Sequence, residues 1–270
     1  MSAEPLVVLV TGATRGIGFA IATEFANRGH YVYGGGRSWK DGGADAFFTG
    51  LGLDITDENS VNDAVKRILD ERGAIDVLIN NAGISHCGPL EETSLDYGRK
   101  VFETNYFGLL RMIDAVLPTM RKRKSGTIAN ISSAAGRIGI PYQGHYSASK
   151  FAVEGLSESF RYELMQFGIR VILIQPGDVE TGIWERTKTP VPDGSAYTES
   201  MTRFLDVKEK EMGGESTPPE DVARDIADIV LSDTKKFRHP VAKMAGVFLF
   251  LRKILPDGVF FRAVERNYKV

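Results

Sequence analysis

The sequence has little cysteine and histidine. Cys87 is the single cysteine among 270 residues, and there are only four histidines. One cysteine excludes an internal disulfide and is typical of a reducing compartment. We interpret Cys87 as a small residue near a pocket rather than as a nucleophile. Because cysteine and histidine do not cluster, the sequence predicts no metal site.

A long apolar run is also missing. The stretch MAGVFLFL, residues 244–251, lies between Lys243 and Arg252. It is far shorter than the ~20 residues that span a bilayer. The opening residues MSAEP have neither a basic start nor a small-residue cleavage site, so we expect no signal peptide. The sequence therefore predicts a cytoplasmic protein without a transmembrane segment.

Neither sign of charge dominates. There are 33 Lys and Arg residues against 35 Asp and Glu residues, and the formal net charge is −2. A chain without basic excess is not expected to bind nucleic acid. With 43% hydrophobic and 25% charged residues, it can bury the core of one large domain or two small ones. We predict one domain over residues 1–270.

Short apolar runs alternate with helical patterns over the first two thirds of the chain. The strand-like runs are PLVVLV, YVYGGG, GLGLDI, IDVLIN, GTIANIS and RVILIQP. Helical patterns are FAIATEFANRG and the stretches near residues 59–72, 94–122 and 145–168. This alternation predicts an α/β fold with a doubly wound, Rossmann-like parallel sheet. Ligands of such sheets bind beyond the carboxyl ends of the strands.

A glycine-rich turn joins the first predicted strand to the first helix. It reads TGATRGIG, with glycines at positions Gly12, Gly16 and Gly18. A strand that enters such a turn and then a helix directs backbone N–H groups and the positive helix end toward one place, which suits a phosphate. The spacing differs from the common GxGxxG. The alternative interpretation is a turn that serves chain geometry alone.

Tyr146 and Lys150 are four residues apart in HYSASKFAVEGLSESF. A helix would place the phenol and the ammonium on one face. A free tyrosine titrates at about 10, and a neighbouring cation is expected to lower the pKa of Tyr146. The pair therefore indicates proton exchange with a substrate oxygen. Taken alone, the spacing also fits an exposed helical pair.

Six motifs, in this order, resemble those of the short-chain dehydrogenase/reductase family, in its single-domain branch. They are TGATRGIG at 11–18, NNAG at 80–83, NxxG at 105–108, the second serine of ISSAAG at 133, YSASK at 146–150 and PGDVET at 176–181. The resemblance implies hydride transfer between a nicotinamide cofactor and a carbonyl or alcohol, and assembly as a homodimer or homotetramer.

The resemblance also implies roles for single residues. Tyr146 is the proton donor in reduction and the base in oxidation, and Lys150 lowers its pKa and holds the nicotinamide ribose. Ser133 binds the substrate oxygen, with Ser132 as the competing choice. Asn105 resembles the residue that anchors a water for proton relay, and its alternative is an interior hydrogen-bonding asparagine. The implied cofactor site comprises Gly12, Thr14, Arg15, Gly16, Ile17, Gly18, Arg37, Asp54, Ile55, Asn81, Ala82, Gly83, Tyr146, Lys150, Pro176, Gly177, Val179 and Thr181.

Charge at the end of the second strand favours NADP(H) over NAD(H). A carboxylate at that place would accept hydrogen bonds from the adenosine ribose of NAD, whereas NADP needs a cation for its extra phosphate. The run YVYGGGR ends with Gly36 and Arg37, and Arg15 lies in the glycine-rich turn. Guanidinium groups match phosphate geometry, so these residues predict NADP(H). Asp54 resembles the family's aspartate beside the adenine.

The composition changes after the sixth strand-like run. The segment of about 181–217 is rich in Thr, Pro, Gly and charge, and we expect a substrate lid there. The alternative is a surface excursion whose apolar residues complete a minor core. The pocket wall is expected to include Phe151, Trp184, Met201 and Phe204, which favours a bulky lipophilic ketone or aldehyde of steroid, retinoid or acyl-lipid type.

An apolar extension of about 240–270 ends the chain and resembles the tail of hydroxysteroid, retinol and acyl-lipid reductases. We expect it first to pack on the core or in an oligomer interface, and the alternatives are that it folds over the substrate or contacts a membrane surface. The expected activity is reduction of a lipophilic carbonyl with NADPH. The alternatives are an oxidative NAD(P)-dependent alcohol or hydroxysteroid dehydrogenase and a non-catalytic NADP(H)-binding regulator.

Overall fold

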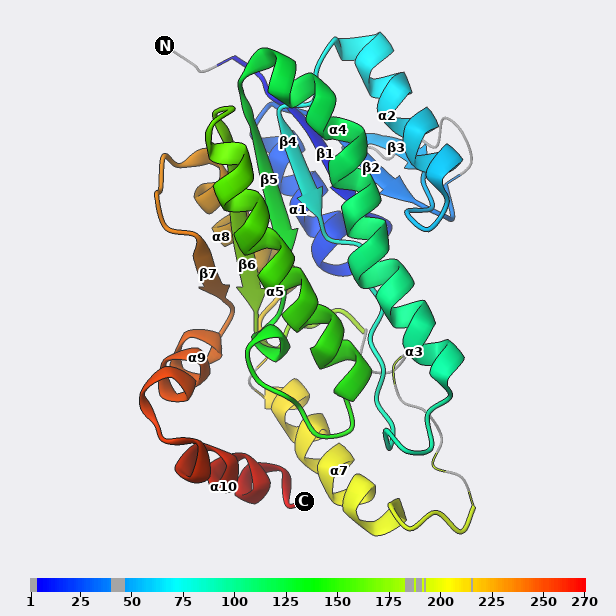
Figure 1. Ribbon diagram of the computed structural model, residues 1–270, viewed down its shortest axis with the longest axis vertical. Coiled ribbons are helices and arrows are strands. Elements are labelled where there is room, and N and C mark those ends of the chain that lie inside the picture. Colours follow the sequence, from blue (N-terminus) through cyan, green and yellow to red (C-terminus); the bar gives the residue numbers. More distant parts are fainter. Residues whose placement is uncertain (1–3, 40–46, 183–186, 188–190, 192, 215) are drawn as a thin grey trace.

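A parallel sheet forms the centre of the molecule (Figure 1). The computed structural model describes residues 4–39, 47–182, 187, 191, 193–214 and 216–270. Within these residues the sheet has seven strands in the order β3-β2-β1-β4-β5-β6-β7, and each neighbouring pair is parallel. The strands are β1 (Val7–Thr11), β2 (Tyr31–Gly36), β3 (Thr49–Gly52), β4 (Val77–Asn80), β5 (Gly126–Ile131), β6 (Ile169–Pro176) and β7 (Arg238–Val241). The predicted α/β fold with a doubly wound sheet is confirmed.

Helices cover both faces of this sheet. α2, α4 and α5 pack on one face, and α1 and α8 pack together on the other (Figure 1). The helices are α1 (Gly16–Asn27), α2 (Glu58–Arg72), α3 (Leu95–Phe102), α4 (Leu109–Arg123), α5 (Gly144–Met165), α7 (Thr198–Gly214), α8 (Pro219–Leu231), α9 (Ala245–Ile254) and α10 (Asp257–Tyr268), with a π-helical turn η1 (Glu103–Gly108) and a short 3₁₀ turn η2 (Ala134–Gly136).

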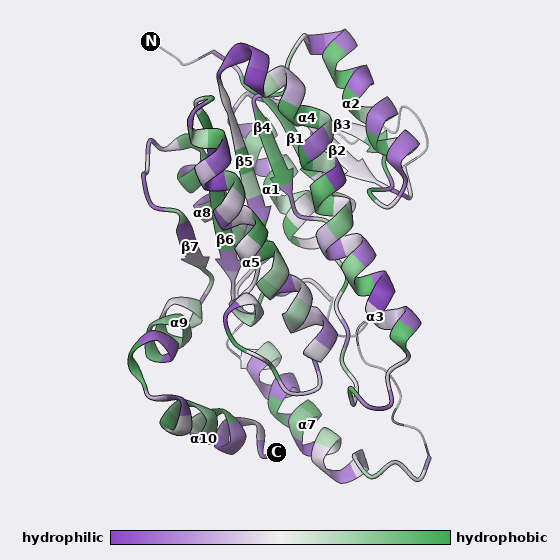
Figure 2. Ribbon diagram, in the orientation of Figure 1, coloured by the Kyte–Doolittle hydropathy of each residue, from purple (hydrophilic) through white to green (hydrophobic). Residues whose placement is uncertain are grey.

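The central strands are buried along their whole length. Every residue of β1 and of β4 is buried, and β4 is strongly hydrophobic in Figure 2. Strands with helices on both faces have no solvent side, so their sequences are continuous apolar runs rather than alternating ones. This is why the runs VVLVT and VLIN are visible in the sequence.

Helix α2 shows how local sequence sets an element. The side chain of Asp57 accepts hydrogen bonds from the backbone N–H groups of Asn59 and Ser60 and so caps the first turn. Gly73 ends the helix in the left-handed conformation, at φ 77°. The buried residues recur at helical spacing, at Val61, Ala64, Val65 and Ile68. One face of α2 therefore packs on the sheet.

Three features differ from the sequence expectation. The helix expected near residues 94–122 is divided into α3 and α4 by the π-helical turn η1. The strand β7 and the helices α7 to α10 were not among the predicted elements. The strand β3 covers Thr49–Gly52 and pairs with β2, so Leu53, Asp54 and Ile55 of the predicted run GLGLDI follow the strand and are not part of it.

The carboxyl ends of the parallel strands meet at one end of the molecule. Helices α7, α9 and α10 lie beyond that end (Figure 1). Among the described residues, no helix is long and apolar enough to cross a membrane. The loops that follow β1 to β6 at this end carry most of the residues predicted to form the site, while Asn105 lies in η1 and Tyr146 and Lys150 lie in α5.

Candidate active site

The turn between β1 and α1 accepts only glycine at three places. Gly12 and Gly16 have φ values of 68° and 57°, a region that residues with a side chain rarely adopt. A Cβ on Gly18 would lie 2.3 Å from the carbonyl oxygen of Gly12. Because these two segments of the backbone lie so close together, the start of α1 lines the cavity, where its backbone N–H groups can bind a ligand.

Thr11 and Asn81 hold this turn against the end of β4. Thr11 Oγ1 accepts hydrogen bonds from the backbone N–H groups of Asn81 and Ala82, both at 3.0 Å. Asn81 Nδ2 donates to the carbonyl oxygens of Thr11 and Gly12, at 3.0 and 3.2 Å. The Asn81 amide therefore orders the glycine-rich turn in this structure.

A cavity of about 380 Å³ lies at the ends of the strands, within the volume range of ligand and cofactor sites. Thirteen of the residues predicted to bind cofactor line it: Gly12, Thr14, Arg15, Gly16, Ile17, Gly18, Arg37, Asp54, Ile55, Asn81, Ala82, Gly83 and Thr181. Predicted site residues outside its lining are Asn105, Ser133, Tyr146, Lys150, Pro176, Gly177 and Val179.

Nine lining residues were absent from the prediction: Gly36, Leu53, Thr56, Ile84, Ser85, Tyr97, Lys100, Thr104 and Thr187. Five of these, Gly36, Leu53, Thr56, Ile84 and Thr104, directly follow or precede predicted residues, so their place along the chain is a usable signal. Tyr97 and Lys100 reach the cavity from α3, and only the packing of that helix brings them there.

At the end of β2, a Cβ on Gly36 would lie 2.2 Å from Thr14 Cγ2, so a side chain at this position would require the Thr14 side chain to move. The next residue, Arg37, is exposed and lines the cavity. Across from it, burial opposes ionisation of Asp54, but hydrogen bonds from Thr56 and the charge of Arg37 leave the pKa of that carboxyl below its ordinary value.

Tyr146 and Lys150 lie one turn apart on α5, as predicted from their spacing. Lys150 Nζ is 5.8 Å from the centre of the Tyr146 ring and donates a hydrogen bond to the carbonyl oxygen of Ile131 at 2.8 Å. The lysine is only 5% exposed. Burial lowers the pKa of Lys150 to about 8, because a charged ammonium is poorly solvated there.

Ser133 rather than Ser132 meets the tyrosine. Ser133 hydrogen-bonds the Tyr146 phenol, and its oxygen also accepts from the backbone N–H of Ala135 at 3.1 Å. Burial raises the pKa of Tyr146, the hydrogen bond with Ser133 lowers it, and the nearby carboxylate of Asp178 raises it. The expected lowering of the Tyr146 pKa is therefore wrong for the protein alone, because desolvation of the phenolate outweighs the favourable contacts.

Asn105 lies in η1, where its amide is fully engaged by the protein. Its Oδ1 accepts from the backbone N–H of Ile84 at 2.8 Å, and its Nδ2 donates to the Ile84 carbonyl and to Ser149 Oγ, both at 2.9 Å. A Cβ on Gly83 would lie 3.2 Å from Asn105 Oδ1 and 3.7 Å from Lys150 Nζ. Asn105 thus joins the loop after β4 to α5, and the cavity wall adjoins the lysine.

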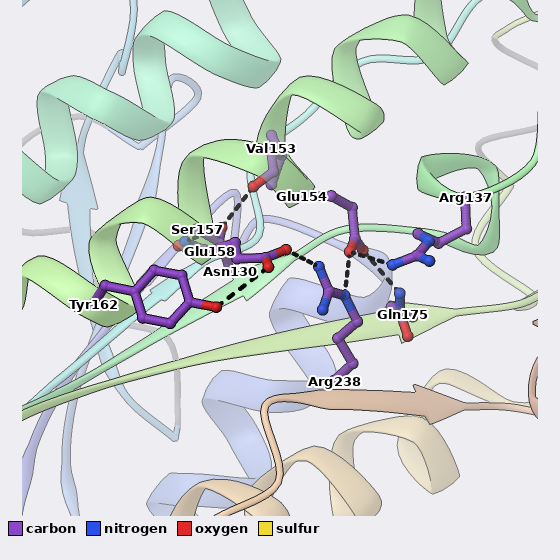
Figure 3. A network of polar contacts seen from close by, with 9 residues as sticks. All are labelled: Asn130, Arg137, Val153, Glu154, Ser157, Glu158, Tyr162, Gln175 and Arg238. Atoms are coloured by element: carbon purple, nitrogen blue, oxygen red, sulfur yellow. Dashed lines mark hydrogen bonds and ion pairs between the residues drawn. The ribbon is translucent and has the colours of Figure 1, made fainter. Parts of the chain in front are cut away.

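A polar network around Glu154 anchors α5 to the far strands (Figure 3). Glu154, one turn after Lys150, accepts from Gln175 Nε2 of β6 at 2.9 Å and from Arg238 Nε of β7 at 2.8 Å. The same arginine donates to Glu158 at 2.7 Å. These contacts fix the helix that carries Tyr146 relative to β6 and β7. A network of this kind orients an element more than it stabilises the fold.

The predicted residues after β6 hold that strand end in place. The backbone N–H of Gly177 donates to the Val241 carbonyl of β7 at 3.0 Å, and Val179 forms an isolated bridge with Thr217. Thr181 lines the cavity, and a Cβ on Gly16 would lie 3.2 Å from the Thr181 Cβ. Of these residues, Thr181 is the one that faces the cavity.

The apolar residues of the predicted lid form a minor core. Met201 and Phe204 of α7 are fully buried with Cys87, and the Phe204 ring lies 5.1 Å from that of Tyr268 in α10. Phe151 lies apart from them, 46% exposed. Trp184, predicted for the pocket wall, falls outside the described residues. Met201 and Phe204 thus fit the alternative interpretation, in which the apolar residues of this segment complete a minor core.

Lys208 ties α7 to the loop after β6. Its ammonium lies 3.1 Å from Asp178 Oδ1 and 2.8 Å from Glu211, and it sits 6.0 Å from the ring centre of Tyr268. Although burial opposes the charged form, the phenol and the two carboxylates raise the pKa of Lys208. Because Asp178 also influences Tyr146, this ion pair connects the predicted lid to the catalytic side of the site.

Comparisons with known proteins agree with this geometry. A family model described as short chain dehydrogenase matches residues 6–191. The chain is 39% identical over 270 residues to the 3-ketodihydrosphingosine reductase of Bacteroides thetaiotaomicron, with 99% of each chain covered. A short-chain dehydrogenase from Streptomyces avermitilis has a similar structure, with a TM-score of 0.81, 30% identity, and 98% of this chain and 97% of that chain covered.

A second solved structure, a short-chain dehydrogenase from Burkholderia cenocepacia in complex with NADP, gives a TM-score of 0.77 at 26% identity, with 96% of this chain and 97% of that chain covered. The fold and site define a nucleotide-binding oxidoreductase of the Rossmann type. The chain belongs to the short-chain dehydrogenase/reductase family, whose members bind a nicotinamide cofactor and act on alcohol and carbonyl groups.

Proposed function

We propose that the protein reduces a bulky lipophilic ketone or aldehyde with NADPH. The observation that carries this proposal is the meeting of Ser133, Tyr146 and Lys150 beside a cavity that begins at a glycine-rich turn. When bound, the cofactor supplies a hydride to the carbonyl carbon. Ser133 hydrogen-bonds the carbonyl oxygen, and the Tyr146 hydroxyl donates the proton to it. Lys150 Nζ, next to Gly83, holds the nicotinamide ribose.

The choice of NADP(H) rests on the end of β2. Position 36 is a glycine and offers no carboxylate to accept from the ribose of NAD, and Arg37 offers a guanidinium at the cavity. Arg15 lines the same cavity from the turn before α1. Two cations without an acid at position 36 suit the extra phosphate of NADP.

Replacing Arg37 with aspartate is expected to raise the KM for NADPH by about ten- to hundredfold while the KM for NADH changes little or falls. The reason is the loss of a charge-assisted contact with the extra phosphate and its replacement by repulsion. Steady-state kinetics with both cofactors measures the ratio. Arg224→Asp, on the exposed surface of α8, is the matched control. An unchanged preference in Arg37→Asp would refute the phosphate site.

The proposed substrate is a lipid with a ketone near a polar end and a long apolar chain. Support comes from the relative that is called a 3-ketodihydrosphingosine reductase. We propose that the segment of about 181–217 closes over this chain as a lid. Apolar walls recognise such a chain by burying its surface.

The test is NADPH consumption by the purified full chain with a panel of carbonyl compounds. The panel holds 3-ketodihydrosphingosine, shortened analogues of it, a ketosteroid, retinal, a long-chain aldehyde, a 3-oxoacyl thioester and a small ketone. We expect kcat/KM to rise with chain length by roughly fourfold per added methylene until the pocket is filled, as expected for ~0.8 kcal/mol per buried CH₂. A preference for the small ketone, or NADPH binding without any turnover, would overturn the proposal.

A further inference from the structure

The apolar stripe of α9 faces away from the protein. Val247, Phe250, Leu251 and Ile254 follow the i, i+3, i+4, i+7 spacing that normally turns toward a core. Instead Val247 is 50%, Phe250 60% and Ile254 54% exposed. Among the described residues of this helix, Ala245 is the buried one. α9 thus exposes most of its apolar side chains to solvent.

Helix α10 extends the same surface while being fixed to the protein. Its inner side buries Phe260 and Tyr268, with Val264 packed on the minor core. Its outer side leaves Val259 and Phe261 about half exposed. Figure 2 shows hydrophobic and hydrophilic residues side by side along both helices. We call the exposed set the α9–α10 face: Met244, Val247, Phe248, Phe250, Ile254, Val259 and Phe261.

Basic residues outnumber acidic ones in the segment that carries this face. Residues 240–270 contain six cations, Lys243, Arg252, Lys253, Arg262, Arg266 and Lys269, against two acids, Asp257 and Glu265. Their side-chain charge is therefore +4, while the whole chain carries −2, so the remaining residues carry −6. Positive charge is thus concentrated in this segment of an otherwise acidic chain. Large exposed apolar side chains among cations are typical of helices that lie in a membrane interface.

The charge distinguishes between two possible occupants. A second copy of the chain, paired through the same face by two-fold symmetry, would bring two patches of +4 together. An anionic bilayer complements the cations and takes up the apolar side chains at the boundary between headgroups and acyl chains. We propose that the α9–α10 face docks the protein peripherally on membranes that contain anionic lipid.

Docking through this face would bring the bilayer beside the predicted lid. Tyr268 of α10 packs on Phe204 of α7, and Asn267 Nδ2 donates to Glu211 of α7 at 3.0 Å. Arg203 of α7 donates to the Lys269 carbonyl at 3.0 Å. If the proposed lipid-like substrate is correct, it enters from the bilayer next to α7. The docking itself does not depend on that substrate.

The test is flotation of the full chain with vesicles of phosphatidylcholine and with vesicles of phosphatidylcholine mixed with phosphatidylglycerol. We expect binding to the anionic vesicles that weakens with added salt. The double variant Phe250→Ser/Ile254→Ser should lower the vesicle partition coefficient at least tenfold, since two large apolar side chains no longer insert. Lys253→Glu/Arg262→Glu should remove the preference for anionic vesicles.

Met165→Ser is the matched control, because Met165 is 72% exposed at the distant end of α5. Circular dichroism and NADPH turnover with a water-soluble ketone establish that each variant is folded. The proposal is wrong if the parent protein does not bind anionic vesicles, or if the Phe250→Ser/Ile254→Ser variant binds them as well as the parent does. It is also wrong if that variant only converts an oligomer into a smaller species in light scattering, which would make this face a contact between copies.

Discussion

Replacement of Tyr146 by phenylalanine is expected to lower kcat by ~10²- to 10⁴-fold, the usual contribution of a positioned proton donor. Tyr146 is partly buried and its phenol is hydrogen-bonded to Ser133, so the substitution removes the proton while the ring keeps its packing on α5. Affinity for NADPH should change less than about threefold, because the phenol adds one hydrogen bond at most to ground-state binding. Turnover with the carbonyl compound of the panel that reacts best measures kcat. A fluorescence titration with NADPH measures cofactor affinity separately.

Tyr162→Phe is the matched control for this substitution. Tyr162 lies on the same helix, is 65% exposed, and bonds only loosely to Glu158, at 3.5 Å. The Tyr162→Phe variant should have the same turnover and the same cofactor affinity as the parent protein. If Tyr146→Phe retained the parent's kcat, another group would have to deliver the proton, and the proposed mechanism would fail.

The fold was predictable because its signals are local. Buried parallel strands require continuous apolar runs, and the turn at Gly12 and Gly16 requires positive φ, so both leave a mark in the sequence. β7 leaves none, since Arg238–Val241 is short, contains Pro240 and is a strand only by pairing with β6. The helices after β6 are a different case: α8 has buried residues at helical spacing that are readable in the sequence, whereas α9 leaves its apolar residues exposed and α7 buries its own against α10.

The residues of the site were predictable in type but not in environment. The spacing of Tyr146 and Lys150 correctly placed both on α5, yet it contains no information on burial, which reverses the expected direction of the Tyr146 pKa. The π-helical turn at Asn105 depends on hydrogen bonds with Ile84 and Ser149, which are distant in the sequence. Their catalytic roles stay predictions, and the substitutions described here test them.

Lys150→Met is expected to change the pH dependence of stability. The lysine is buried, and its pKa falls from the ordinary 10.5 to about 8 on folding. The unfolded chain therefore holds this proton more tightly, so the charged lysine opposes folding fully below about 8. That cost disappears as pH rises toward 10.5. At about 1.4 kcal/mol per pH unit, the full cost is roughly 3 kcal/mol.

Because methionine carries no charge, the parent should gain stability relative to Lys150→Met by roughly 3 kcal/mol between pH 7 and 10.5. Urea unfolding of both proteins without cofactor, at several pH values, measures this change. Loss of the hydrogen bond to Ile131 adds an offset that does not vary with pH, so the slope rather than the absolute difference is decisive. Lys210→Met, at an exposed position of α7, controls for the removal of a lysine. Parallel curves for the parent and Lys150→Met would mean that burial does not lower this pKa, and that Lys150 meets the substrate site fully charged.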